Sequence, residues 1–361
     1  MFEFKPDYEK AKQRIEAWWH CEVTDRAMTY IMFPKPDKEQ APVPKKEHAT
    51  LRERWLDTEF IVERTLAHIS NTVYYADAMP IAYPNLGPDI MAAFYGCELD
   101  FGESTSWSVP ILHDWKPGSV RRIKLDLDGF YFKKILELTD ALLEVGRGRF
   151  IVGYTDLHGA ADTVAAFRDP QALNIDVLEH PEEVKKLCRR VTDGLLKVYD
   201  IFHEKLSAAG MPSTSWMQVI HDGGKFHIPS NDFSCMVSDR IMDELFIEDT
   251  VKECAHMDRN IYHLDGPQAL RYLDRIMAIP NMQAIQWVPG AGRDYWRKSV
   301  DVYKRIQAAG KALVIYIPAK DLDDLFEHLR PEGVWVWLSG VSNKEDADAA
   351  LKKIAKWTRR S

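Results

Sequence analysis

Several features that would place the chain in a specialised class are missing from its 361 residues. No run of about 18 apolar residues occurs, which excludes a membrane-spanning helix. The five cysteines are odd in number and form no CxxC pair, so the chain offers no disulfide framework. The N-terminal segment carries charges throughout and contains no apolar signal core. We therefore expect a cytoplasmic protein.

The sequence contains no stripe of positively charged residues. The formal net charge is -8, and no stretch of lysine or arginine is long enough to bind a nucleic-acid backbone. No GxGxxG turn follows a first strand, so the sequence carries neither a nicotinamide nor a flavin signature. The composition, 46% hydrophobic and 28% charged, excludes a disordered or fibrous chain and indicates a globular one.

The first 70 residues are predicted to form a helical and loop extension packed on the main domain. Apolar spacing and breaker residues predict a helix over Asp7–Trp19, a strand over Met28–Pro34, a surface loop over 35–46 and a helix over Leu51–Ala67. An apolar, aromatic, strand-like run then covers Thr72–Ala82.

From residue 71 to residue 361, short continuous apolar strands alternate with helices. Such strands are typical of a parallel sheet that is covered on both faces. An open doubly wound sheet shows the same alternation, but it would favour the glycine-rich turn that is missing here. We therefore predict an α/β fold, a single (β/α)8 barrel over 71–361, since such barrels take ~250 residues or more.

Polar or aromatic side chains stand at the end of almost every predicted strand. In a barrel these positions meet at the carboxyl face, where active sites are built. We expect substrate contacts from Tyr75, Asp77, Asp156, His158, Trp216, Gln286, Trp287 and Trp337. The residues expected to do chemistry are Asp222, Asp232, His263 and Asp265.

His263 and Asp265 form the most informative pair, because residues two apart on a strand point to the same side. With His221 they could bind zinc or another divalent metal. In the alternative interpretation Asp265 caps the helix beginning at Pro267, His263 is a satisfied core residue, and Asp222 only closes a turn. Asp162 would similarly cap the helix that follows Asp156.

The segments YTDLHGAADTVAAFRDPQAL, DFSCMVSDRIMDELFI and IYHLDG make the last 210 residues or so resemble the uroporphyrinogen decarboxylase superfamily. The resemblance implies a (β/α)8 barrel. In its corrinoid-dependent methyltransferases, the strand matching IYHLDG carries a zinc-binding His-x-Cys-Gly, and the last strand supplies a second cysteine. Here His263 matches, Asp265 replaces the cysteine, and Val341 and Ser342 stand where the second is expected. The decarboxylase's arginine-rich motif is also missing, so the chain resembles a divergent member of the superfamily.

Three functions remain open. The first is a methyltransferase-like enzyme that acts on a small molecule, with a divalent metal and a corrinoid carrier protein as partner. The second is a carbohydrate-active hydrolase, lyase or isomerase that pairs two acids from Asp77, Asp156, Asp222, Asp232 and Asp265 and stacks a sugar on tryptophan. The third is a barrel that binds a ligand without catalysis. The tryptophans and the proline-rich early loop are compatible with a homodimer.

Overall fold

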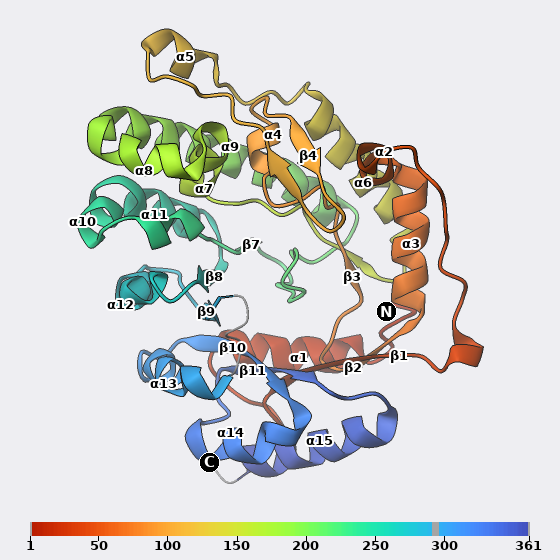
Figure 1. Ribbon diagram of the computed structural model, residues 1–361. Helices are drawn as coiled ribbons and strands as arrows, with labels where there is room; N and C mark the ends of the chain where they lie inside the picture. The colour runs from red at the N-terminus through yellow and green to blue at the C-terminus, as the bar shows by residue number, and fades with distance from the viewer. Residues whose placement is uncertain (1, 291–295, 360–361) are drawn as a thin grey trace.

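The computed structural model describes residues 2–290 and 296–359, which form a mixed α/β fold (Figure 1). The strands are β1 (Met28–Pro34), β2 (Thr72–Ala76), β3 (Ile81–Ala82), β4 (Leu99–Phe101), β5 (Ser106–Ser108), β6 (Ile151–Val152), β7 (Phe226–His227), β8 (Arg259–Asp265), β9 (Ala284–Val288), β10 (Ala312–Pro318) and β11 (Val334–Ser339). The α-helices are α1 (Tyr8–Trp19), α2 (Leu51–Leu56), α3 (Thr58–Ser70), α4 (Ile90–Ala93), α5 (Pro117–Arg122), α6 (Phe130–Gly146), α7 (Ala160–Arg168), α8 (Pro170–Glu179), α9 (Pro181–Ala208), α10 (Asp239–Ile241), α11 (Ile247–His256), α12 (Leu273–Met277), α13 (Val300–Ala308), α14 (Leu322–His328) and α15 (Lys344–Thr358). Among the shorter turns, η2 (Asp232–Met236) matters for the site.

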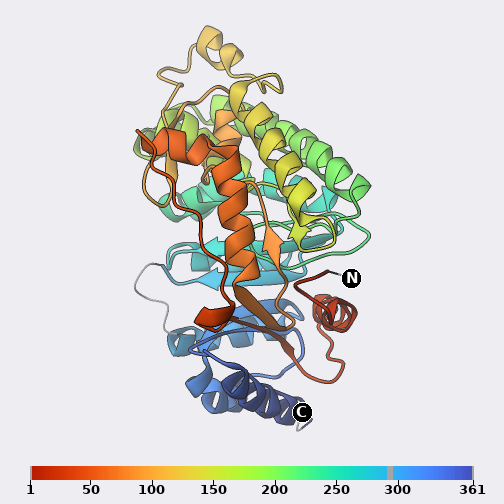
Figure 2. The same cartoon turned by 90° about the vertical axis from the view of Figure 1, so that its right-hand side faces the viewer.

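The main sheet has seven strands in the order β2-β1-β11-β10-β9-β8-β7, and every neighbouring pair except β1 and β2 is parallel. A second parallel pair, β3 and β6, forms a small sheet of its own, and β4 and β5 form a hairpin. Most of the helices lie outside the strands (Figures 1 and 2), whereas α1 lies beside β1 and packs Trp18 against Trp335 of β11. The predicted α/β fold with a parallel sheet is confirmed.

The strands form where β-branched and aromatic residues follow one another without a break. The sequences of β10 and β11, ALVIYIP and VWVWLS, are buried along almost their whole length. Trp335 packs against Tyr30 of β1, with ring centroids 4.6 Å apart, and stacks on Trp337 at 5.5 Å. The described helices are amphipathic or short, and none of them is long and apolar enough to cross a bilayer.

The first 70 residues contribute a strand to the main sheet. The predicted strand Met28–Pro34 is β1, which pairs in parallel with the last strand of the chain, from Met28 opposite Trp335 to Ile31 opposite Leu338. This pairing joins sequence positions about 300 apart and cannot be inferred from local pattern. The domain division at residue 70 stays a prediction.

The run Thr72–Ala82, predicted as one strand, is two. β2 ends at Ala76, which adopts a positive φ of 58°, and the chain turns before β3 begins. β2 runs antiparallel to β1, with Ala76 opposite Tyr30 and Thr72 opposite Pro34. The end of β2 therefore lies at the amino edge of the parallel strands, opposite to the edge where the site was expected.

Candidate functional site

The loop after β6 brings an acid and a histidine to the carboxyl edge of the strands. His158 Nε2 lies 3.3 Å from Asp156 Oδ2. Gly159 then passes so close to the chain after β7 that a Cβ at this position would lie 2.7 Å from the carbonyl oxygen of Ser230. Only glycine permits this approach, which holds the loop against its neighbour and lets α7 begin directly afterwards.

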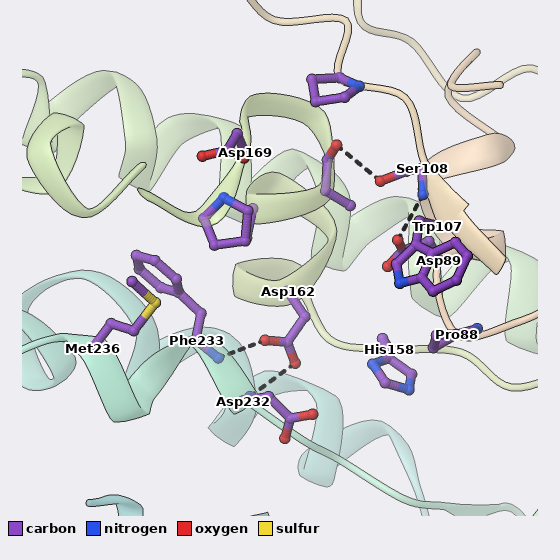
Figure 3. A pocket seen from close by; sticks show the side chains of 14 residues that line it. Pro88, Asp89, Trp107, Ser108, His158, Asp162, Asp169, Asp232, Phe233 and Met236 are labelled. Carbon is purple, nitrogen blue, oxygen red and sulfur yellow. Dashed lines mark hydrogen bonds between the residues drawn. The ribbon is translucent and has the colours of Figure 1, made fainter. Parts of the chain in front are cut away.

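Asp162, in the first turn of α7, fixes the position of Asp232. Its carboxylate accepts hydrogen bonds from the backbone N–H groups of Asp232 at 3.1 Å and Phe233 at 2.8 Å, and from Ser230 Oγ at 3.2 Å. The side chain predicted only to cap a helix thus joins α7 to η2 and sets two carboxylates side by side (Figure 3). Local sequence shows an acid in a first helical turn, and only tertiary structure shows which N–H groups it meets.

His263 and Asp265 lie on the same face of β8, as strand alternation predicts. His263 stands opposite Gln286 of β9, and its Nδ1 lies 2.6 Å from Gln286 Oε1. The amide of Gln286 in turn donates to Tyr316 Oη at 2.8 Å. Because an amide oxygen only accepts, neutral His263 carries its proton on Nδ1 and presents the lone pair of Nε2. Trp216 packs edge-on against the imidazole at 5.3 Å.

Two groups of possible metal ligands meet at this edge and share Asp232. One consists of His158, Asp162 and Asp232, and the other of Asp232, His263 and Asp265; within each, the ligand atoms lie within 4.8 Å of one another. One buried carboxylate oxygen on each of Asp156, Asp232 and Asp265 has no hydrogen-bond partner. Buried acceptors without a donor are costly, so this donor set fits a bound cation.

The clustered acids shift two pKa values in the site. Burial and the neighbouring charge of Asp232 raise the pKa of Asp162 to about 6. Burial alone would lower the pKa of His158, but the charges of Asp156, Asp162 and Asp232 outweigh it and raise the pKa to about 10. His158 is therefore protonated at neutral pH and is the cationic partner of the acids around it.

Two cavities open beside these residues. The larger, of about 570 Å³, lies between α7, η2 and the β4–β5 hairpin, and Asp162, Asp232 and Trp107 are among its walls (Figure 3). The smaller, of about 200 Å³, is lined by Asp156, His158, Trp216, Ile228, Ser230 and His263. His158 lines both cavities, so the predicted residues Asp156, His158 and Trp216 surround the space next to His263.

The structure does not bring His221 and Asp222 to this group. Ser213 and His221 exchange backbone hydrogen bonds of 2.9 Å, so the chain between them forms a loop that returns to the point where it began. His221 packs on Trp19, and Asp222 forms an ion pair with Lys12 of α1. The following glycines lead into β7, and Phe226 of β7 pairs with Arg259 at the start of β8, about 13 Å along that strand from His263.

Asp77 and Tyr75 also lie away from the site, because β2 runs antiparallel. Asp77 is fully buried and is held by Arg26, at 2.5 and 2.8 Å, and by the backbone N–H of Thr29 at 2.8 Å. Tyr75 donates its hydroxyl proton to Asp348 of α15. In this structure Asp77 and Tyr75 therefore make contacts within the fold, away from the candidate site.

The remaining predicted residues separate according to the face of their strand. Gln286 faces the site, whereas its neighbour Trp287 is buried on the helix side and donates to Ser299 Oγ at 2.9 Å. Trp337 is half-buried on the inner face, 5.4 Å from the rings of Tyr30 and Tyr316. Trp287 thus serves packing, and Trp337 forms part of an aromatic floor.

No protein-family model and no curated protein sequence matches this chain. A solved structure, a methyltransferase from Methanosarcina mazei, is similar to it with a TM-score of 0.55 and 10% sequence identity. The match covers 99% of this chain and 99% of the methyltransferase. At such an identity the likeness concerns the fold, and it includes the first 70 residues together with the rest.

Proposed function

We propose that this chain is a metal-dependent enzyme with a methyltransferase-like (β/α)8 barrel that is closed through β3 and β6. The ion would bind to Asp232, His263 and Asp265. The observation that carries the proposal is the convergence of these side chains from η2 and β8, with ligand atoms within 4.8 Å and a buried, unpartnered oxygen on each carboxylate. The fold likeness to a methyltransferase favours methyl transfer as the reaction class.

Two carboxylates and one imidazole suit Zn²⁺ or a harder ion such as Mn²⁺. No cysteine of the described residues belongs to either ligand group, and the thiol of Cys235 instead donates to the carbonyl oxygen of Asp265 at 3.1 Å. The ion would supply Lewis-acid polarisation of a substrate oxygen or nitrogen. Thiolate ligation is not part of the proposal.

The chain's own side chains would orient the substrate and hold protons. Gln286 keeps the Nδ1 proton of His263 in place and so directs Nε2 towards the ion. His158 would hold a proton on the imidazole beside Asp156, within the smaller cavity, where a substrate group can receive it. Trp216 and Ile228 line the same cavity and would exclude water from it.

Elemental analysis after loading with Zn²⁺ or Mn²⁺ tests the proposal. Wild-type protein should retain a stoichiometric divalent ion after dialysis, and His263→Ala and Asp265→Ala should lose it. His221→Ala and Asp222→Ala are matched controls, because they remove the same residue types near the start of β8 and should keep the ion. A wild-type protein that retains no ion, or site variants that keep it, would overturn the proposal.

Replacing Gln286 by leucine should weaken metal binding about 10- to 100-fold, because a partner that orients a metal ligand contributes to affinity on this scale. The measurement is competition with a chromophoric chelator. Gln283→Leu is the control, because Gln283 lies just before β9 and bonds to the backbone of Asn260 instead of to a ligand. Equal affinities in wild type and Gln286→Leu would show that the His263–Gln286 contact does not orient the histidine.

A carbohydrate-active enzyme is the second candidate. Asp162, whose pKa is raised to about 6, lies beside the carboxylate of Asp232, and two neighbouring carboxyl groups are what glycoside chemistry uses. Trp107 on the rim could stack on a sugar ring. Turnover of a glycoside that persists after complete removal of metal by a chelator would favour this candidate over the first.

Partners and location are proposals as well. A small-molecule substrate would enter the larger cavity, and a corrinoid carrier protein would supply or accept the methyl group. The protein would act in the cytoplasm as a homodimer, and its mass measured by light scattering during gel filtration tests the oligomeric state.

A further inference from the structure

The larger cavity has walls of a kind that surround organic cations. Trp107 of β5, Phe233 of η2 and Met236 line it, and they face it from the hairpin on one side and from η2 on the other (Figure 3). Trp107 is 56% exposed and Met236 is 43% exposed, although residues of these types are usually buried. At about 570 Å³ the cavity is much larger than a metal ion needs and accommodates an organic molecule.

The charged residues in these walls are almost all acids. Asp89, Asp162, Asp169 and Asp232 line the cavity, and no lysine or arginine among the described residues does. None of the four carboxylates forms an ion pair with lysine or arginine within residues 2–290 and 296–359. Of the lining residues that the structure describes, His158 is the only basic one, and it is already engaged by Asp156, which lies outside the larger cavity.

Backbone amides hold these carboxylates in position without neutralising them. Asp89 accepts from the N–H of Ser108 at 2.8 Å. Asp169 accepts from the first N–H groups of α8 at 2.9 and 3.2 Å. The acids are therefore fixed around the cavity and keep their negative field, which is the arrangement that attracts a positively charged ligand.

We propose that the larger cavity binds a small organic cation bearing an alkylammonium group, which lies between Trp107 and Phe233 with its charge facing Asp162 and Asp169. Aromatic faces attract ammonium groups through the ring quadrupole, and carboxylates add Coulomb attraction. An anionic ligand would be repelled by every charged residue that is described in the lining, except His158. The inference rests on the proposed function in one respect. The bound cation would extend from this cavity towards Asp232, where the reaction is proposed to take place.

The proposed metal ion would not reverse this preference. An ion held by Asp232, His263 and Asp265 would lie at the inner end of the cavity, where those acids become its ligands. Asp89 and Asp169 belong to neither ligand group and stay free to attract the cation at the outer end. The carboxylates of the whole site still outnumber the positive charges of one divalent ion and His158.

Isothermal titration calorimetry with isosteric pairs tests the charge preference. Choline is compared with 3,3-dimethylbutan-1-ol, and butylammonium with butan-1-ol, so that each pair differs in charge at nearly constant shape. We expect at least one cation to bind at least tenfold more tightly than its neutral counterpart. If neither cation binds more tightly than its counterpart, the inference is overturned.

Two variants test the position of the cation. Trp107→Leu and Asp169→Asn should each weaken binding of the cation severalfold, and asparagine keeps the helix cap at Asp169. Phe130→Leu is the control for loss of an exposed aromatic ring, because Phe130 lies on α6 and lines none of the described cavities named above. Cation binding unchanged in both cavity variants would overturn the placement.

The titrations are carried out on chelator-treated and on metal-loaded protein. Cation preference without retained metal would sustain this inference and defeat the metal proposal. Retained metal without cation preference would do the reverse, so the two failures are distinguishable.

Discussion

Asp77→Ala should lower the free energy of unfolding by about 3–5 kcal/mol, because removing one partner of a buried ion pair leaves the other charge unpaired. Asp77 is fully buried, and Arg26 is buried as well and donates two hydrogen bonds to it. The same carboxylate accepts from Thr29 N and from Arg14, and so joins α1, β1 and the turn after β2. Urea denaturation followed by circular dichroism measures the loss.

The matched control is Asp25→Ala. Asp25 pairs with Arg14 but is largely exposed, so its removal should cost less than about 1 kcal/mol. The double variant Arg26→Met, Asp77→Leu removes both charges and should recover much of the stability that Asp77→Ala loses. A change below about 1 kcal/mol in Asp77→Ala would contradict the structural role and return Asp77 to the list of functional candidates.

Glu253→Gln should make the protein more stable above pH 8 by on the order of 3–5 kcal/mol while leaving its stability near pH 4 almost unchanged. Glu253 of α11 is 2% exposed, and burial, with the charges of Asp249 and Asp162, raises its pKa to about 8. The backbone N–H of Ala160 donates to it, which glutamine would still accept.

The direction of this pH dependence follows from the number of protons that the folded and unfolded states bind. The pKa of Glu253 is about 8 in the folded protein and 4.5 for the unperturbed side chain, so between these values the folded state binds more protons. Wild-type stability therefore falls as pH rises from about 4.5 to 8 and then levels off. Glutamine mimics the protonated side chain and removes this part of the pH dependence.

Urea midpoints of wild type and Glu253→Gln, measured from pH 4 to pH 9, test this expectation. Glu248→Gln is the control on the same helix, because Glu248 is exposed and pairs with Arg189. Parallel pH profiles for wild type and Glu253→Gln would mean that Glu253 is ionised in the folded protein or reaches water. The result matters for the site, because Glu253 lies against Gly159, and Gly159 is the residue that joins His158 to α7.

The local sequence pattern was enough to predict which side chains converge wherever one strand supplies two side chains to the same face. His263 and Asp265 converge on the site because residues two apart on β8 share a side, and this spacing is visible in the sequence. Gln286 was expected at a strand end, and the register of β8 with β9 places it opposite His263. Asp232 was singled out through the family resemblance, and it lies with them.

The predicted residues that lie away from the candidate site were placed there by strand direction or by a returning loop. Asp77 follows a strand in the sequence, but that strand is antiparallel, so its end lies at the opposite edge. His221 and Asp222 come at the end of a loop that reverses the chain and returns to Ser213, where the loop begins. Local sequence contains the strand and the polar residue after it, but not the direction in which the strand enters the sheet.

The sequence by itself determined the α/β class, the alternating strands and helices and the acid and histidine pairs, because these depend on periodicity and on residues close along the chain. Tertiary structure alone decided which pairs meet. Asp162 became the acceptor for the backbone of η2, and the β4–β5 hairpin brought Trp107 over a cavity whose other walls include η2, more than 120 positions away. Such contacts arise from packing between distant segments, and no local pattern records the partner that a side chain will meet.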